Sequence, residues 1–413
     1  MRINFSKTKS TFPLPDPIKL QKDSFKWFLE KGLAETLNEV GEIHDMTGRG
    51  WALSFSNPRI DKPNRTVDTA KIMGLNYDAP WYITATIRQV GTKQEKSKEI
   101  YMGDMPIMGE DGVFCVNGVS KVVINQLTRS QGVFFSMERD AAYGIDLPSA
   151  KILPKIGAWI DFEISKQGII NVRIDKKRKF PVTVLLRVFG LETNDDILRA
   201  FADDVQDRAS SPITKTLSKD PSSNYNEAMI ELYKRVRPGE PAVLDAAKAL
   251  ADNLFFNIKR YSLGDIGRFK INMKFGFDIP VEEKYFTLQK TDLVEIIRYL
   301  IHLWQGDDPT FYKIDDIDSL SNRRVKPVGE LLQSEVRYGF YQLERLAREK
   351  MALQPREKLP DPSVLISPRP VSARIISFLS SGQLAQLLDQ YNPLDSLDHR
   401  RRLSVMGKGG LTR

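Results

Sequence analysis

The chain of 413 residues contains one cysteine, Cys115, and only three histidines, His44, His302 and His399. A single thiol excludes a disulfide within the chain and gives no indication of an oxidising compartment. The histidines are too scattered to predict a zinc site from their spacing. Because no histidine or lysine cluster adjoins Cys115 to lower its pKa, we interpret this residue as a small core residue.

Long apolar runs are missing too. The most apolar stretch, FPVTVLLRVFGL, is shorter than the roughly 20 residues that a bilayer requires, and Arg187 interrupts it. The start, MRINFSKTKSTFPLP, lacks the apolar region of a signal peptide. These absences predict a soluble cytoplasmic protein.

Complete catalytic motifs are also absent. The stretch GKGG at 407–410 is not a phosphate-binding loop, because that motif needs a glycine where Arg402 stands. The acidic cluster DDID at 315–318 lacks the ligand pattern of a calcium loop, and we interpret it as a boundary loop. The sequence contains no nucleophile elbow and no dinucleotide fingerprint. We therefore expect no catalytic residue and no metal ligand in this chain.

Basic residues are in excess, with a formal net charge of +8 and a pI of about 9.2. This balance is compatible with a polyanionic partner, although many cytosolic proteins share it. The run Lys176–Lys179 is most simply a solvated face, and contact with nucleic acid is the alternative.

Hydrophobic periodicity indicates a mixed α+β fold. A helix is predicted from Ser24, its expected N-cap, because apolar residues recur at helical spacing up to Leu37. Alternation in WYITATIRQV and around the turn Asn117–Gly118 predicts strands and a hairpin. A second hairpin is expected in WIDFEI and IINVRID, followed by a helix with Pro181 in its first turn. Residues from about 192 to 310 have mainly helical patterns, and GELLQSEVRYGFYQLERLAREKMA predicts a long helix.

The C-terminal segment is unusually rich in donors and acceptors around a turn at Asn392–Pro393. Arginine forks suit phosphate oxygens, whereas amides suit sugar hydroxyls and base edges. This composition leaves two interpretations open, a nucleic-acid surface and a disordered tail.

This segment, SSGQLAQLLDQYNPLDSLDHRRRLSVMGKGGLTR, closely resembles the rifamycin-binding segment of the β subunit of bacterial DNA-directed RNA polymerase. The stretches SFKWFLEKGL, YMGDMPIM, VNGVSKVVINQLTRSQGVFF, WIDFEI, VRIDKKRKFPVTVLLR, DDIDSLSNRR and PVSARIISF resemble that subunit in the same order. The resemblance runs from near residue 20 to the last residue.

The resemblance implies a β-rich protrusion module made from both ends of the chain and an inserted, more helical lobe. The expected boundaries are 1–140 for the first part of the protrusion, 141–318 for the lobe, 319–375 for the second part of the protrusion, and 376–413 for an incomplete fork or rifamycin-binding region. It also implies that these modules form one jaw of the DNA cleft, and that the tail lines the path of the nascent RNA.

The resemblance further implies two sets of site residues. The antibiotic pocket corresponds to Arg129, Gln383, Leu384, Gln386, Leu387, Asp389, His399, Arg402 and Ser404. The expected contacts with RNA are Gln386, Arg400, Arg401, Arg402 and Arg413. Two positions depart from the family: Leu387 stands where phenylalanine is usual, which removes an aromatic wall, and Gln131 stands where proline is usual.

The family's subunit continues for several hundred residues beyond GGLTR. The implied activity, transcription of DNA from the four ribonucleoside triphosphates, therefore belongs to a multisubunit nucleotidyltransferase, and we expect the chain alone to be inactive. No cofactor is expected in this chain, because the family's Mg²⁺ ligands lie on the β′ subunit. The implied partners are β′, the α subunits, ω, a sigma factor, template DNA, nascent RNA and the missing C-terminal part of β.

The ending of the sequence is compatible with a gene fragment, a split subunit or an incomplete record. We expect the segment from about residue 376 to be mobile, because its packing partners would be absent. The alternative function is a non-catalytic protein that binds nucleic acid or polymerase and derives from the same fold.

Overall fold

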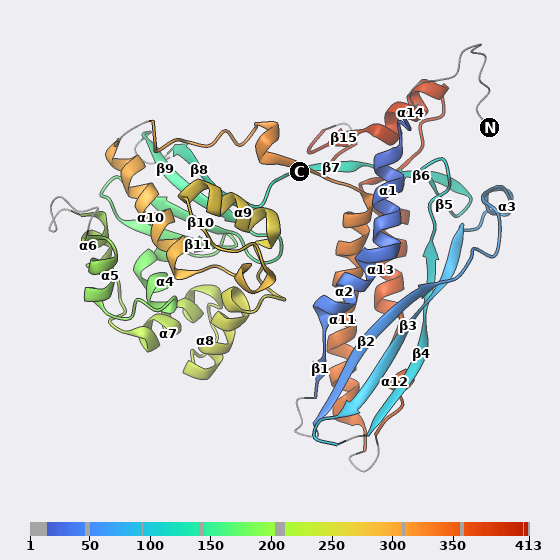
Figure 1. Cartoon of the computed structure of the whole chain (residues 1–413), viewed down its shortest axis with the longest axis horizontal. Coiled ribbons are helices and arrows are strands. Elements are labelled where there is room, and N and C mark those ends of the chain that lie inside the picture. Colours follow the sequence, from blue (N-terminus) through green and yellow to red (C-terminus); the bar gives the residue numbers. More distant parts are fainter. Residues whose placement is uncertain are drawn as a thin grey trace. The chain divides into compact units, whose positions relative to one another are not determined.

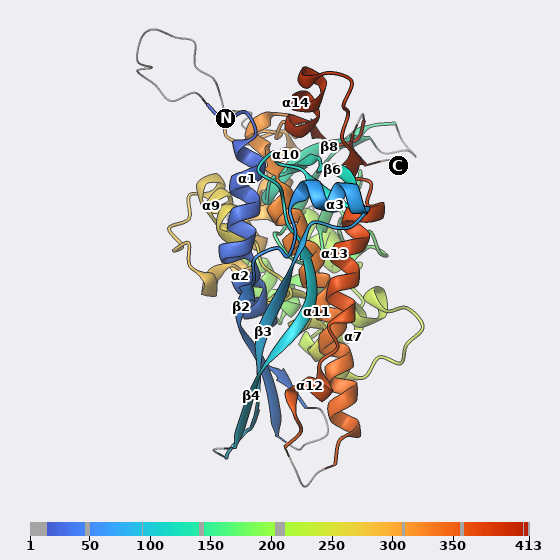
Figure 2. The same ribbon diagram turned by 90° about the vertical axis from the view of Figure 1, so that its right-hand side faces the viewer.

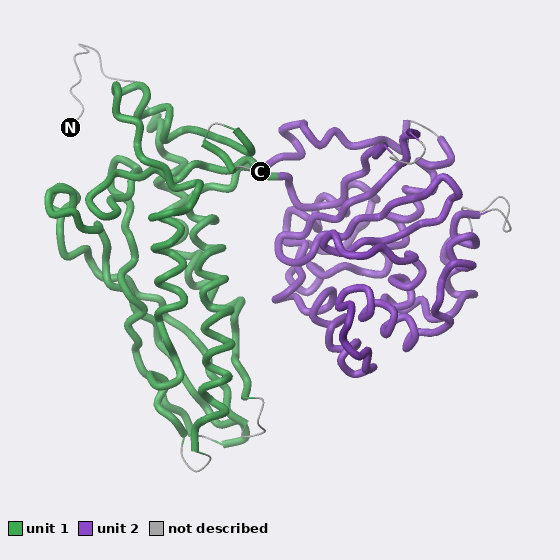
Figure 3. The backbone as a smooth tube through the Cα atoms, turned by 180° about the vertical axis from the view of Figure 1, so that it is seen from behind, with its two compact units in different colours: residues 1–128, 325–413 green, residues 129–324 purple. Residues whose placement is uncertain are grey.

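The computed structural model describes residues 15–45, 50–92, 94–139, 144–202, 211–307, 310–355, 359–407 and 409–411. The chain divides into two compact units (Figure 3). Unit 1 consists of residues 1–128 and 325–413, and unit 2 is the continuous segment 129–324. The predicted α+β class is confirmed. Unit 1 contains both ends of the chain, and unit 2 is inserted between them.

Unit 1 is built from long helices and antiparallel strands (Figure 1). Its helices are α1 (Lys19–Trp27), a π-helical turn (Phe28–Gly32), α2 (Leu33–Val40), α3 (Val67–Met73), α11 (Val328–Leu353), α12 (Pro362–Leu365), α13 (Arg369–Ser381) and α14 (Pro393–Arg401). Its strands are β1 (Ile43–His44), β2 (Trp51–Ile60), β3 (Asp78–Gln89), β4 (Glu95–Pro106), β5 (Phe114–Val116), β6 (Val119–Val123), β14 (Ala385–Leu387) and β15 (Leu403–Ser404). Strands β7 (Asn125–Arg129) and β13 (Arg323–Lys326) carry the chain across the unit boundary.

Three sheets organise these strands. The largest has the order β1-β2-β3-β4 and is antiparallel throughout. The two small sheets have the orders β14-β6-β5 and β13-β7-β15, so each contains one short strand from the C-terminal segment. The predicted hairpin at Asn117–Gly118 is confirmed: it joins β5 to β6, and its two residues have φ angles of 51° and 77°.

The core of unit 1 lies between the large sheet and its helices. In β3 every second residue is buried, including Trp81, Ile83 and Ile87, which confirms the predicted alternation. Helices α1, α2, α11 and α13 run along one face of this sheet (Figures 1 and 2). The buried residues of helix α11 include a stripe at spacings of three or four residues: Val328, Leu332, Val336, Phe340, Leu343, Ala347 and Met351.

The expectation that Ser24 caps its own helix is wrong. Helix α1 begins five residues earlier, at Lys19, so Ser24 lies inside it and is buried. The Ser24 hydroxyl instead accepts a hydrogen bond from the backbone N–H of Gly329, at 2.8 Å. Gly329 is in the first turn of α11, whose N–H groups have no partner within the helix. Ser24 therefore caps α11 through Gly329, which lies 305 residues later in the sequence.

Unit 2 combines one sheet with a layer of helices. Its strands, besides the shared β13, are β8 (Gly132–Arg139), β9 (Asp146–Leu153), β10 (Ile160–Ile164), β11 (Ile170–Ile174) and β12 (Phe180–Pro181). Its α-helices are α4 (Val182–Val188), α5 (Asn194–Ala200), α6 (Pro212–Leu217), α7 (Tyr225–Val236), α8 (Leu244–Ala251), α9 (Gly264–Phe275) and α10 (Lys290–Gln305). Short π or 3₁₀ turns occupy Asp252–Phe256, Glu283–Tyr285 and Leu320–Asn322.

The sheet of unit 2 has the antiparallel order β12-β11-β10-β9-β8. The predicted hairpin of WIDFEI and IINVRID is β10–β11, with Ile160 opposite Ile174. Pro181 is the N-cap of α4 rather than a residue of its first turn, because its ψ of 140° is extended. The acidic cluster at 315–318 also has a structural role, since Asp315 accepts a hydrogen bond from the backbone of Phe135 and pairs with Lys274.

Helices α9 and α10 are joined by a buried ion pair. The side chains of Arg268 and Asp292 are fully buried, and their nitrogen and oxygen atoms lie 2.8 and 2.9 Å apart. Among the described helices, none is long and apolar enough to cross a membrane.

Candidate nucleic-acid interface

The C-terminal segment is attached to unit 1 by two strands. Strand β14 pairs antiparallel with β6, and β15 pairs in parallel with β7. Between them, the side chain of Gln21 in α1 donates to the backbone oxygens of Val123, at 2.8 Å, and of Arg400, at 3.2 Å. We expected mobility from residue 376 because packing partners would be absent. That premise is wrong, since β6, β7 and Gln21 of this chain pack against the segment.

Helix α14 lies between these two strands, where the sequence predicted only a turn. Its N-cap Asn392 accepts a hydrogen bond from the backbone N–H of Asp395, at 2.8 Å, and donates one to the Asp395 carboxylate, at 2.7 Å. Pro393 occupies the first helical position, where its missing N–H costs nothing. The pattern of asparagine, proline and a carboxylate three residues after the cap was the available signal for this helix.

One face of α14 fixes the loop that follows β14. The backbone N–H of Asp389 donates to Nδ1 of His399, at 3.1 Å, and the Ser396 hydroxyl donates to the backbone oxygen of Asp389, at 2.7 Å. The His399 side chain is only 2% exposed, so this contact lies inside the protein. Both the backbone N–H and the backbone oxygen of Asp389 are consequently held by hydrogen bonds with α14 side chains. Sequence reasoning had identified Asp389 and His399 but had missed Ser396.

The three consecutive arginines have different surroundings. Arg402 is mostly buried, and its Nη2 lies 3.7 Å from a carboxylate oxygen of Asp389 and 3.5 Å from one of Asp398. Arg400 is half-buried and donates to the backbone oxygen of Asp111, at 3.0 Å. Arg401 is exposed. Arg401 is thus oriented towards solvent, whereas Arg402 is held in place by carboxylates.

Residues of β14 lie beside this group. The Gln386 side chain donates to the backbone oxygen of Gln383, at 3.1 Å. Leu384 is buried, and its backbone oxygen accepts from Ile124, at 2.8 Å. Leu387 is 61% exposed. Leu384 therefore anchors the strand, and Leu387 remains available to a ligand.

The last described residues lie close to Arg402, Gln386 and Ser404. A Cβ atom placed on Gly409 would lie 3.6 Å from both Nη1 of Arg402 and Oε1 of Gln386. A Cβ atom placed on Gly410 would lie 2.5 Å from the hydroxyl of Ser404. Two distant parts of the segment, β14 and the end of the chain, thus meet at Arg402.

The structure therefore brings together part of the predicted antibiotic pocket. Asp389, His399 and Arg402 are in contact. Gln386 lies beside Gly409, and Ser404 lies beside Gly410. Arg129 is exposed at the end of β7 and belongs to unit 2. Arg413 lies outside the described residues. The assignment of these residues to an antibiotic or to RNA stays a prediction.

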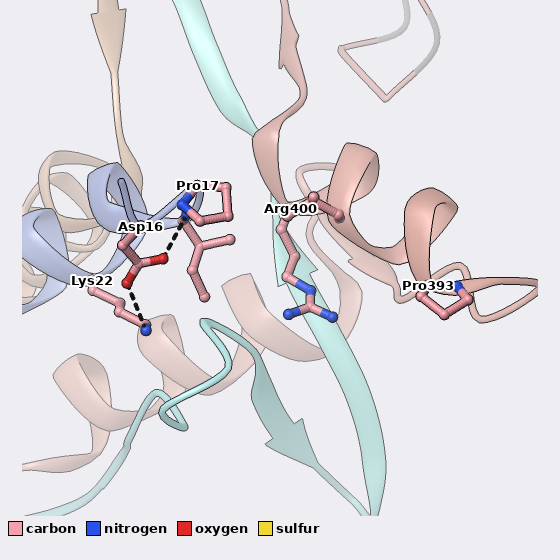
Figure 4. Close-up of a pocket in the computed structure, with 7 residues that line it drawn as sticks. Asp16, Pro17, Lys22, Pro393 and Arg400 are labelled. Atoms are coloured by element: carbon pink, nitrogen blue, oxygen red, sulfur yellow. Dashed lines mark hydrogen bonds and ion pairs between the residues drawn. The ribbon is translucent and has the colours of Figure 1, made fainter. Parts of the chain in front are cut away.

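A separate hollow of about 500 Å³ lies where α14 meets the start of α1 (Figure 4). Its lining consists of Asp16, Pro17, Ile18, Lys22, Pro393, Leu397 and Arg400. The Lys22 ammonium group is paired with the Asp16 carboxylate, at 3.0 Å. None of the residues predicted for the antibiotic pocket lines this hollow, so it is a different feature.

A second basic surface lies on unit 2. Asp175 and Lys176 have φ angles of 49° and 59° in the turn between β11 and β12, and all residues from 175 to 179 are exposed. The backbone N–H of Asp175 donates to the oxygen of Trp159, whose side chain is 45% exposed. Exposed cations suit phosphates, and an exposed indole suits unstacked bases.

The chemistry of the described side chains at these surfaces suits binding. Among the described residues, no group of three histidine, cysteine or acidic side chains could hold a metal ion. The side chains that meet at the C-terminal segment are guanidinium, amide, hydroxyl, carboxylate and imidazole groups. Such groups recognise phosphate oxygens, sugar hydroxyls and polar ligands.

A family model and a bacterial relative both match this chain, and both are described as RNA polymerase. Residues 129–326 match the family model described as RNA polymerase Rpb2, domain 2, a range that coincides with unit 2 to within two residues. The chain is 43% identical over 412 residues to the DNA-directed RNA polymerase subunit beta of Syntrophomonas wolfei subsp. wolfei (strain DSM 2245B / Goettingen). The alignment covers 100% of this chain and 36% of that relative, so the chain spans about a third of the relative's length.

Proposed function

We propose a role in transcription for this chain, which is a homologue of part of the bacterial DNA-directed RNA polymerase β subunit. In this role the two units form one jaw of the DNA cleft, as protrusion and lobe, and the C-terminal segment lines the path of the nascent RNA. The observation that carries the proposal is the identity of 43% along the whole chain. The contacts among Asp389, His399 and Arg402 support it, because residues from separate parts of one segment form a single polar cluster.

The chain would act inside a larger assembly. Phosphoryl transfer requires Mg²⁺ held by carboxylates and positive groups on the triphosphate. We assign the metal ligands to β′ and the triphosphate-binding residues to the remainder of β, with the α subunits, ω and a sigma factor as further partners. Purified chain supplied with template, the four ribonucleoside triphosphates and Mg²⁺ should synthesise no RNA. Template-dependent synthesis by the chain alone would refute this division of labour.

Binding of nucleic acid can be tested on the chain itself. Fluorescence anisotropy with a single-stranded RNA should show affinity that falls with salt, because released counterions supply much of the binding free energy. Arg401→Gln should reduce the slope of log K against log salt by about 0.7 for one lost phosphate contact. Arg345→Gln is the matched control, since Arg345 is 83% exposed on α11, outside the proposed surface. Equal slopes for the two variants would argue against Arg401 as an RNA contact.

The antibiotic pocket can be tested in polymerase assembled with this chain. Ser404→Leu should block inhibition by a rifamycin while RNA synthesis persists, because it adds volume and deletes a hydroxyl. Loss of one buried hydrogen-bond partner typically costs about 1–3 kcal/mol. Full retained sensitivity would refute the pocket. If the parent enzyme is already insensitive, Leu387→Phe should create sensitivity by restoring an aromatic wall, and its failure to do so would also count against the pocket.

A further inference from the structure

The two glycines near the end of the described chain adjoin side chains assigned above to the ligand site. Gly409 has a φ angle of 83°, in the left-handed region that favours glycine. A Cβ atom at this position would lie 2.8 Å from Cδ of Arg402, well inside the contact distance of about 3.5–4.0 Å between carbon atoms. The chain can therefore pass this close to Arg402 only without a side chain.

Gly410 makes an equally close approach to Ser404. A Cβ atom there would lie 2.5 Å from the Ser404 hydroxyl and 2.8 Å from the backbone oxygen of Val405. Because the second contact is with backbone, rotation of the serine side chain would not relieve it. Two backbone hydrogen bonds hold this turn of the chain in place. The N–H of Gly410 donates to the oxygen of Gly407, at 2.9 Å, and the N–H of Leu411 donates to the oxygen of Val405, at 3.3 Å.

Arg402 has little freedom to move away from an added side chain. Its side chain is 15% exposed, and its guanidinium lies between the carboxylates of Asp389 and Asp398. A displacement of Arg402 would disturb Asp389, which His399 and Ser396 hold in turn. A side chain added at Gly409 should therefore displace Arg402 and, through Asp389, disturb its contacts with His399 and Ser396.

We propose that Gly409 and Gly410 are positioning residues, which let the end of the segment pack against Arg402 and Ser404 and so set the shape of the site that binds the rifamycin or the RNA. The proposal rests on the function proposed above for that site. It adds that the site's specificity depends on two residues without side chains, which make no ligand contact of their own.

Three alanine substitutions separate the close packing from backbone strain. Gly409→Ala combines a positive φ angle with the contact to Arg402, whereas Gly410→Ala has the contact to Ser404 without a positive φ angle. Gly407→Ala is the matched control: its φ angle is 153°, but among the described residues no atom outside its immediate neighbours lies within 4 Å of the added Cβ. Only backbone strain distinguishes Gly407→Ala from the parent.

The first readout is inhibition of the assembled polymerase by a rifamycin. Gly409→Ala and Gly410→Ala should raise the half-inhibitory concentration by about tenfold or more, as expected for overpacking of a fixed group. Gly407→Ala should change it by less than about threefold. An equal effect of all three variants, or none from Gly409→Ala and Gly410→Ala in a sensitive enzyme, would overturn the inference.

The second readout does not depend on the proposed function. Hydrogen exchange of residues 399–406 in the purified chain should be faster in Gly409→Ala and Gly410→Ala than in Gly407→Ala. If the parent polymerase is insensitive to the rifamycin, the antibiotic pocket fails and this measurement alone decides the positioning role. Unchanged exchange in both variants would overturn that role whatever the inhibition data show.

Discussion

Asp292→Ala should destabilise unit 2 by about 3–5 kcal/mol, the typical cost of removing one partner from a buried ion pair. The Asp292 carboxylate accepts hydrogen bonds from both terminal nitrogens of Arg268. It also accepts one from the backbone N–H of Gln289, at 2.8 Å. Both charged side chains are fully buried. After the substitution, the acceptors that Arg268 retains among the described residues are the backbone oxygens of Tyr285 and Thr287, so a buried positive charge is left without a carboxylate partner.

An exposed pair of the same chemistry provides the control. Arg345 and Glu349 lie 3.1 Å apart on α11, with side chains 83% and 56% exposed. Surface pairs of this kind contribute about 0–1 kcal/mol, and alanine is a good helix former, so Glu349→Ala should change stability by about 0.5 kcal/mol or less. The two variants therefore compare the same charge removed from a buried and from an exposed position.

The assay is native-state hydrogen exchange of slowly exchanging amides in the unit that carries each substitution: β10, at the centre of the unit 2 sheet, for Asp292→Ala, and β3 of unit 1 for Glu349→Ala. The slowest amides report global opening. The double variant Arg268→Met with Asp292→Leu should recover most of the loss, since apolar groups of similar volume can replace a buried pair at little cost. A cost below about 1 kcal/mol for Asp292→Ala would refute the reasoning. The same conclusion would follow if the double variant were no more stable than Asp292→Ala.

Three further predictions concern single groups. Ser24→Ala should lower the free energy of unfolding by about 1–2 kcal/mol in urea titrations, because the buried N–H of Gly329 loses its cap, whereas Ser377→Ala on the exposed face of α13 should cost less than half of that. The Asp361 carboxyl should titrate with a pKa of about 2 in carbon NMR, because hydrogen bonds from Ser363 and the charge of Lys98 lower the pKa from its ordinary value of 3.8. Since the folded pKa is the lower one, the stabilisation is present above pH 4 and is lost as pH falls towards 2, and an Asp361 titration at 3.8 would contradict the cap on α12. Burial raises the pKa of the Cys115 thiol, so labelling by a disulfide reagent at pH 8 should be slow in the native chain and fast in urea, and equal rates would contradict its place in the core.

The elements that the sequence predicted are those whose pattern is local. The stripe of α11 repeats over about seven turns of helix, and β3 alternates from Asp78 to Ile87, so each pattern indicates both an element and its buried face. The turn Asn117–Gly118 carries its own conformational preference. These features need no knowledge of the partner, because period and backbone preference are properties of the segment itself.

Ser24 illustrates what a local pattern cannot decide. A serine before an apolar helical stretch is a usual N-cap, and the segment that precedes it gave no stronger start. In the structure the helix extends back to Lys19, and the hydroxyl is used by the first turn of α11 instead. The position of that turn depends on packing between segments 305 residues apart, which the sequence around Ser24 does not encode.

The same limit explains the error about the C-terminal segment, and it bears on how the candidate site is built. Strands β14 and β15 contain three and two residues, too few for any periodicity, and their partners β6 and β7 lie more than 250 residues earlier. Pairing through backbone groups leaves no trace in the side chains, so the segment resembled a solvated tail. Because the anchors are β6, β7 and Gln21, the mutual placement of Gln386, Arg402 and Ser404 is fixed by residues within this chain. A larger assembly would therefore complete a ligand site around these residues rather than order them for the first time.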